Sequence, residues 1–240
     1  TTIGLEVWTG AGPNREARSN FIFTNAGRFE VTAEGEAYGA LFYNGAYADN
    51  SGSIIVRGGT TALGVALFGH GPELVNSGLI SVEATTGVSI GVSISTLSPF
   101  AQTRLINTGT IIADQAVREN DFDGRFIRGD DVIDNRGLMI GDVILNYGND
   151  RVINSGVIEG DVVFGDGNDV FLGERGIVHG SISLGGGDDR AVLGASADRL
   201  DAGSGRDEVS AGDGDDVING GAGDDVLRGD LGDDHLSGGA

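Results

Sequence analysis

The sequence of 240 residues contains no cysteine and no lysine, and aromatic side chains make up only 6% of it. Without cysteine, neither disulfides nor thiolate metal sites can hold the fold together. No stretch approaches the ~18 apolar residues of a membrane-spanning helix. Residues 1–20 lack the basic segment and apolar run of an ordinary secretory signal peptide, so export would need another route.

The charge of the chain is strongly acidic and unevenly distributed. The formal net charge is −21, and residues 121–240 carry most of it, with twenty-six acidic residues against nine arginines. Such a field repels phosphate groups and anionic lipid surfaces and attracts cations, so we expect no nucleic-acid binding and no membrane insertion. Forty-four glycines also fit poorly with an ordinary helical or α/β domain, and a repetitive fold is expected instead.

An Asn-x-Gly motif recurs along the first two thirds of the chain. Asparagine tolerates left-handed backbone and glycine favours it, so each copy predicts a turn, and the β-branched residues behind it predict a short strand. The copies begin at Asn25, Asn50, Asn76, Asn107, Asn135 and Asn154, with Glu174 as a degenerate seventh. The residue four positions later is always apolar: Phe29, Ile54, Ile80, Ile111, Met139, Ile158 and Val178. Stacked copies predict parallel strands and a ladder of hydrogen-bonded amides.

A Gly-x-Asp motif recurs in the second half. Its spacing is 19 or 20 residues up to Asp189 and then becomes nine, so that two repeats make an 18-residue coil. No Pro- or Ser-rich hinge interrupts the change of spacing, which predicts one continuous solenoid. The aspartates are Asp131, Asp150, Asp169, Asp189, Asp207, Asp216, Asp225 and Asp234, and Asp198 keeps the nine-residue phase.

The fold class predicted from these repeats is all-β: a single parallel β-helix that runs continuously into a β-roll. We expect three segments: residues 1–125 with large irregular coils, residues 126–184 with regular coils of 19 or 20 residues, and residues 185–240 with 18-residue coils. The stretches 95–104 and 115–125 are predicted to be loops that protrude from coil corners.

The stacked aspartates indicate a metal. Carboxylates one coil apart, at ~4.8 Å, repel by roughly 0.9 kcal/mol at the dielectric constant of water and about 3.5 kcal/mol at an effective value of 20. The apolar side chains of residues 201–240 are too few to offset this, so the tail should be disordered without a counterion. Calcium takes six to eight oxygen ligands, including backbone carbonyls, and a Gly-x-Gly-x-Asp turn offers both kinds.

Residues 185–239, and "GSGRDEVSAGDGDDVINGGAGDDVLRGD" above all, resemble the nine-residue repeats of the RTX (haemolysin-type calcium-binding) family. The resemblance implies a calcium ion between each turn and the turn one coil later, about four to five ions in all. The pairs are Asp189 with Asp207, Asp207 with Asp225, Asp198 with Asp216, Asp216 with Asp234, and Asp169 with Asp189. The glycines implied as ligands are Gly185, Gly187, Gly203, Gly205, Gly212, Gly214, Gly221 and Gly223.

Several turns depart from this repeat. Ser196 stands where the turn before Asp198 should have glycine, and Asp230 stands four residues before Asp234. The turns that end in Asp131 and Asp150 also lack the first glycine, so they can be read as structural turns with no ion.

Residues 20–180 resemble, more loosely, the Asn-Ser-Gly β-helices of bacterial haemagglutinin-like adhesins and autotransporter passengers. Together the two resemblances imply a secreted, non-enzymatic bacterial protein of the extracellular space or cell surface, exported by a type I channel and folded by extracellular calcium. Self-association through the solenoid ends and binding of a cell-surface or matrix glycan are the partners considered. The alternative is a polysaccharide lyase or epimerase with an RTX tail, although no catalytic residues are predicted.

Overall fold

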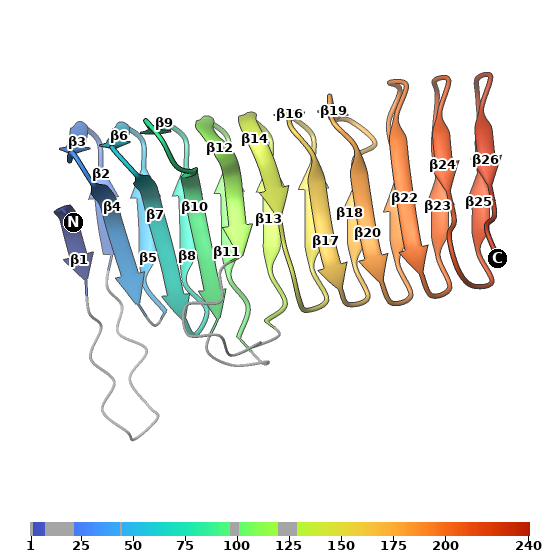
Figure 1. The fold of residues 1–240 in the computed structure, drawn as a ribbon, viewed down its shortest axis with the longest axis horizontal. Helices are drawn as coiled ribbons and strands as arrows, with labels where there is room; N and C mark the ends of the chain where they lie inside the picture. The colour runs from blue at the N-terminus through green and yellow to red at the C-terminus, as the bar shows by residue number, and fades with distance from the viewer. Residues whose placement is uncertain (1, 8–21, 44, 97–100, 120–128) are drawn as a thin grey trace.

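The computed structural model describes residues 2–7, 22–43, 45–96, 101–119 and 129–240. Every regular element in these ranges is a β-strand, and the strands pair in parallel from coil to coil. Figure 1 shows the coils stacked along one axis, from β1 at the N-terminal end to β26 at the C-terminal end. The predicted fold class, a continuous parallel β-solenoid, is therefore confirmed.

A 16-stranded sheet runs along the whole solenoid. Its main path comprises β1 (Thr2–Val7), β4 (Glu36–Tyr43), β7 (Thr61–Gly69), β10 (Ser89–Thr96), β12 (Thr110–Glu119), β14 (Leu138–Ile144), β17 (Val162–Asp166), β20 (Ile182–Gly186), β22 (Arg199–Ser204), β24 (Val217–Asn219) and β26 (His235–Ser237). The strands off this path are β3 (Arg28–Thr32), β6 (Ser53–Gly58), β9 (Leu79–Ala84), β16 (Val157–Glu159) and β19 (Ile177–Val178).

A 10-stranded sheet forms the opposite face. It comprises β2 (Ile22–Asn25), β5 (Tyr47–Asn50), β8 (Glu73–Asn76), β11 (Arg104–Asn107), β13 (Val132–Asn135), β15 (Arg151–Asn154), β18 (Val170–Leu172), β21 (Arg190–Val192), β23 (Glu208–Ser210) and β25 (Val226–Arg228).

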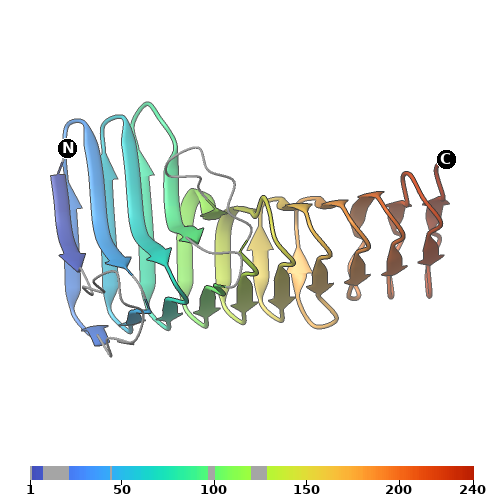
Figure 2. The same cartoon turned by 90° about the horizontal axis from the view of Figure 1, so that it is seen from below.

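The coils become smaller along the chain. A coil near the N-terminus has three strands, as in β5, β6 and β7, whereas a coil near the C-terminus has two, as in β23 and β24. Figure 2 shows wide coils at the blue end and narrow coils at the red end. The narrow coils have room for only a thin layer of apolar side chains between their two sheets.

The predicted amide ladder is present. In each step one asparagine Nδ2 donates to the Oδ1 of the asparagine one coil later, at 2.7–2.9 Å, from Asn25 to Asn154. The degenerate copy does not extend it, because Asn154 Nδ2 donates instead to the carbonyl oxygen of Ile177. The apolar residues that follow the motif point into the core, and from Ile54 to Val178 each is at most 7% exposed.

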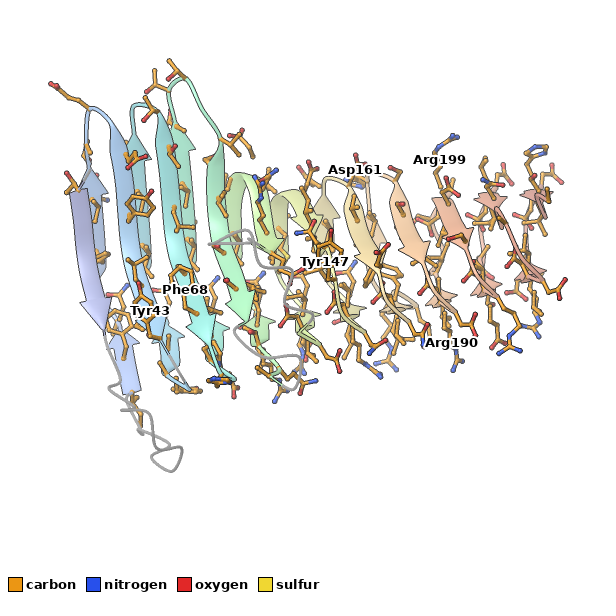
Figure 3. The ribbon with its side chains drawn as sticks, turned by 60° about the horizontal axis from the view of Figure 1, so that its bottom comes forward. Tyr43, Phe68, Tyr147, Asp161, Arg190 and Arg199 are labelled. Carbon is orange, nitrogen blue, oxygen red and sulfur yellow. The ribbon has the colours of Figure 1, made fainter. Side chains whose placement is uncertain are left out.

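One hydrophobic cluster extends through the interior from Val31 to Ile218. A smaller, separate cluster lies on β4, β7 and β10 and includes Leu41 and Leu63. Phe68 belongs to this cluster, and its ring stacks on that of Tyr43 with centroids 5.0 Å apart; Figure 3 shows these two side chains next to each other.

The prediction of protruding loops at 95–104 and 115–125 is wrong for several residues. Ser95 and Thr96 belong to β10, Arg104 begins β11, and residues 115–119 belong to β12. The strand continues past residue 115 because β12 pairs with β10 on one side and with β14 on the other. Residues 97–100 and 120–125 lie outside the described part of the chain. The described residues contain no helix long and apolar enough to cross a lipid bilayer.

Candidate metal-binding turns

The repeated aspartates form two columns at opposite edges of the solenoid. In the first column each aspartate immediately precedes a strand of the 10-stranded sheet, and in the second column it precedes a strand of the 16-stranded sheet. The residue after each aspartate points outward, as Figure 3 shows for Arg190 and Arg199, so the aspartate itself points inward. The first column is Asp131, Asp150, Asp169, Asp189, Asp207 and Asp225, and the second is Asp198, Asp216 and Asp234.

Except for Asp198, which begins the second column, each column aspartate accepts a hydrogen bond from the coil before it. The backbone N–H of one column aspartate donates to the Oδ1 of the next, at 2.7–3.0 Å in every pair of both columns. The proposed partners, Asp189 with Asp207 for example, are therefore direct neighbours. An aspartate side chain reaches this N–H from its own tight turn, so it completes the backbone hydrogen bonding at the corner.

The first column begins with Asp131, and a proline in an earlier coil explains why it does not begin sooner. The backbone N–H of Thr103 donates to Asp131 Oδ1 at 3.1 Å, but the equivalent residue one coil earlier is Pro72, which has no N–H to donate. An acceptor side chain is therefore unnecessary at position 103. The position at which the column begins could have been predicted from the sequence, because Pro72 occupies the position of the column one coil before Thr103.

The second carboxylate oxygen of most column aspartates has no partner. Among the described residues, the buried side-chain oxygens without a hydrogen bond are Thr103 Oγ1 and the Oδ2 atoms of Asp131, Asp169, Asp189, Asp207, Asp216 and Asp225. A buried acceptor without a donor costs about 1–3 kcal/mol, and more if it is charged. A row of such oxygens is an arrangement that a bound cation would satisfy.

The glycine turns supply a second kind of oxygen. In the four turns that begin at Gly185, Gly203, Gly212 and Gly221, the first and third residues are both glycines with left-handed φ angles. A Cβ atom on Gly205 would lie 1.9 Å from the carbonyl oxygen of Gly187. Only glycine allows the turns to stack this closely, and the stacking leaves a column of carbonyl oxygens beside the carboxylates.

The two departures noted in the sequence have different structural outcomes. Asp230 takes the place of the first glycine and adopts its left-handed conformation, with φ of 63°, while the Ser210 hydroxyl donates to its carboxylate. In the turn before Asp198, neither Gly194 nor Ser196 is left-handed. The turn at residues 194–198 is therefore the one in the 18-residue coils whose backbone departs from the repeat.

Burial raises the pKa of several column aspartates and so makes them difficult to ionise. It raises the pKa of Asp169 and of Asp189 to about 7, against the effect of a backbone hydrogen bond that lowers each. Burial, followed by the charge of Asp216, raises the pKa of Asp198 to about 6. The pKa values of Asp207 and Asp216 are raised for the same main reason. A cation beside these carboxylates would reverse the effect.

A reciprocal ladder, which the sequence reading missed, runs along the outer side of the turns. In several turns the residue before the column aspartate accepts from the N–H one coil later: Asp188 Oδ1 accepts from Arg206 at 2.9 Å and Asp215 Oδ1 from Asp233 at 2.9 Å. Asn149 occupies this position in an earlier coil. The doublets Asp-Asp and Asn-Asp at the end of most turns were the available signal.

Side chains alone do not form a complete metal site. Among the described residues, no group of three or more His, Cys, Asp or Glu side chains is arranged to hold an ion. Any site in the turns would therefore need backbone carbonyl oxygens in addition to aspartates, and calcium accepts such a mixture.

Parallel coils with stacked Gly-x-Gly-x-Asp turns define a β-solenoid of the calcium-binding type. Residues 183–218 and 210–240 match the family model of the RTX calcium-binding nonapeptide repeat, so the C-terminal segment is an RTX β-roll. RTX repeats bind calcium, and the fold fits a calcium-binding structural protein. No curated protein and no solved structure matches the chain. The resemblance of residues 20–180 to haemagglutinin-like adhesins stays a prediction.

Proposed function

We propose that this protein is a secreted structural β-solenoid whose C-terminal coils fold around calcium ions. The proposed ions, about four to five, lie between the neighbouring turns that end in Asp169, Asp189, Asp207 and Asp225, and between those that end in Asp198, Asp216 and Asp234. The observation that carries this proposal is the row of buried Oδ2 atoms without partners, beside a column of glycine carbonyl oxygens.

The thin apolar core of the last coils supports a calcium requirement for folding. Leu200, Val209 and Ile218 are at most 2% exposed, but Leu227 is only partly buried and Leu236 is 40% exposed. For a calcium affinity near 10⁻⁴ M, a tenfold excess of ion stabilises the folded state by about 1.4 kcal/mol per site. Several such sites together offset the repulsion between stacked carboxylates.

Circular dichroism tests the proposal. Adding millimolar calcium to the chelated protein should increase the β-sheet signal, and chelation should reverse the change. A spectrum that is identical with and without calcium would contradict folding around the ion. Measurement in magnesium serves as the control, because Mg²⁺ demands near-ideal octahedral geometry and keeps several of its waters.

An extracellular or cell-surface location follows from this proposal, because calcium reaches millimolar concentrations there and RTX repeats are typical of secreted proteins. We assign the segments 1–125, 126–184 and 185–240 to a wide scaffold, a transition and the calcium-binding roll. The proposal includes self-association through the solenoid ends, since strand edges can pair with those of another molecule. Loss of any higher-order assembly on chelation, measured by light scattering, tests that association.

A structural role is proposed in preference to catalysis. The buried carboxylates of both columns are engaged with backbone N–H groups of neighbouring turns, which leaves them poorly placed to act on a substrate. Incubation with alginate or pectin, followed by an assay for unsaturated or reducing ends, tests the proposal directly. Release of such products would support the lyase alternative, and surface glycan binding without cleavage would support an adhesin.

A further inference from the structure

The turn at residues 146–150 lies outside the matched repeats, yet it uses their backbone hydrogen bonds. The N–H of Gly148 donates to the carbonyl oxygen of Asp166 at 3.1 Å, and the N–H of Gly205 donates to that of Ala222 at 2.8 Å. In both bonds the N–H of the turn is the donor, and the acceptor is a carbonyl oxygen of the following coil. The backbone of the earlier turn therefore stacks on its neighbour in the same way as a turn of the matched segment.

The carbonyl column also extends to this turn. Gly148 has φ of 126°, and Gly205 in the matched segment has φ of 130°. A Cβ atom on Gly167 would lie 1.5 Å from the carbonyl oxygen of Gly148, closer than the 1.9 Å between Gly205 and Gly187. Neither Asn146 nor Gly167 is left-handed, so each of the two turns differs from the matched turns at one residue. In both places a side chain larger than that of glycine would collide with the carbonyl oxygen of the previous coil.

The carboxylate of Asp169, which lies between the two turns, has one oxygen without a partner, as most aspartates of the matched turns do. Asp169 Oδ1 accepts from the N–H of Asp150 at 2.7 Å, so this carboxylate leans toward the earlier turn. Its Oδ2 is buried and has no hydrogen bond. Asp150 and Asp169 are 2% and 1% exposed, respectively, which is as buried as the aspartates of the matched repeats.

A further buried acid adds negative charge at this place. Glu119 is 4% exposed, and its Oε2 accepts from the N–H groups of Asn146 and Tyr147 at 2.7 and 3.0 Å. Its negative charge contributes to raising the pKa of Asp150 and of Asp169. Acidic groups gathered at one buried place favour a bound cation.

We propose that the column of calcium sites continues beyond the matched repeats, with an ion held between the turns at residues 146–150 and 165–169. The carboxylates of Asp150 and Asp169 and the carbonyl oxygens of the turn glycines are its ligands. The inference rests on the proposed function, because it assumes that the matched turns bind calcium. The competing arrangement is a pair of turns whose buried carboxyl groups are neutral and hold no ion.

Calcium stoichiometry of the full chain tests this site. Asp150→Asn keeps the Oδ1 acceptor for the N–H of Asp131 and removes one charge, so the coil should still fold. We expect native mass spectrometry in calcium to show at least one ion fewer than in the unmodified protein. Asp161→Asn is the matched control, since Asp161 Oδ1 accepts a similar N–H bond from Ser181 at an exposed corner, and it should leave the number unchanged.

Asp207→Asn separates the two proposals. If Asp207→Asn loses an ion and Asp150→Asn does not, the site at 146–150 is absent and the proposed function stands. If neither variant loses an ion, both proposals fail. Should Asp150→Asn not fold, crystals of the unmodified protein soaked in terbium decide the question. An anomalous peak between the turns at 146–150 and 165–169 supports the site, and peaks confined to the later turns overturn it.

Discussion

In the N-terminal half of the solenoid the stacked polar side chain is an amide, whereas in the C-terminal half it is a carboxylate. Each asparagine both donates and accepts, so Asn76 binds Asn107 and Asn107 binds Asn135 with no group left over. An aspartate carboxylate can only accept, so Oδ1 takes a backbone N–H and, in most of the column, Oδ2 is left without a partner. An amide ladder is neutral and complete, but a carboxylate ladder accumulates charge and needs cations or protons.

The two halves also differ in how much apolar area supports the ladder. The three-stranded coils bury residues such as Phe42 and Leu67 almost completely, whereas the last two-stranded coil leaves Leu236 40% exposed. Burial of an apolar side chain stabilises the folded state by roughly 1.5–3 kcal/mol. The N-terminal half is therefore expected to fold without an ion, and the C-terminal coils are expected to depend on one.

Removal of calcium should produce the largest effect, and it should separate the two halves. We expect amide hydrogen exchange in a chelator to lose protection in β22 to β26 while β5 to β12 stay protected, because only the former stack uncompensated carboxylates. Readdition of calcium should restore the protection. Equal loss of protection in both halves, or in neither, would contradict the comparison.

Placing a carboxylate in the amide ladder should destabilise the N-terminal half. Asn107 is fully buried, and Asn107→Asp replaces its donor to Asn135 with a second acceptor. We expect the free energy of unfolding to fall by about 2–4 kcal/mol in urea titrations, with and without calcium. Asn149→Asp makes the same chemical change at an exposed turn and should cost less than about 1 kcal/mol. A loss at Asn107 that calcium restores would contradict the distinction between the ladders.

Much of this architecture could be predicted from spacing, because each motif recurs once per coil and each residue type has a restricted role in a turn. The amide ladder from Asn25 was obtained in this way, whereas the pairing of Asp189 with Asp207 came from the resemblance to RTX repeats. The unpartnered Oδ2 atoms and the reciprocal bonds from Asp188 were not. They depend on the direction in which each side chain leans between coils, and spacing along the chain contains no information about that direction.

Loop positions were predicted less well for a related reason. Residues 115–119 are part of β12, because neighbouring strands on both sides complete their hydrogen bonds. The sequence reading had assigned this stretch to a loop inserted at a coil corner. The left-handed Asp230 is another case, since its conformation follows from the glycines stacked in the same column.

Acid should partly replace calcium. Burial raises the pKa of Asp131 to about 8 and of Asp150 to about 9, above the ordinary aspartate value of 3.8. A group whose pKa is raised in the folded state contributes stability below its unfolded pKa, and that stability is lost as pH rises through the folded pKa. In a chelator, the melting temperature should therefore be higher near pH 5 than near pH 9.

With calcium present this pH dependence should be reversed, because the ion binds the ionised carboxylates and competes with protons. The plots of melting temperature against pH, one with calcium and one with chelator, should then cross. Differential scanning calorimetry at several pH values, with calcium and with chelator, measures both. A chelated protein that becomes more stable as pH rises from 5 to 9 would contradict the neutral-carboxyl account.

Ion pairs at the surface should give the smallest effects, and these effects should differ with the burial of the acidic partner. Arg228 pairs with Glu208 at 3.1 Å, and both side chains are about half exposed, so Arg228→Ala should change the free energy of unfolding by less than about 0.5 kcal/mol. Arg136 binds both carboxylate oxygens of Asp134, whose side chain is 8% exposed. Arg136→Ala leaves that buried carboxylate without its cation and should lower the melting temperature by roughly 2–4 °C. Equal shifts for the two variants in calcium would show that burial of the acidic partner does not matter.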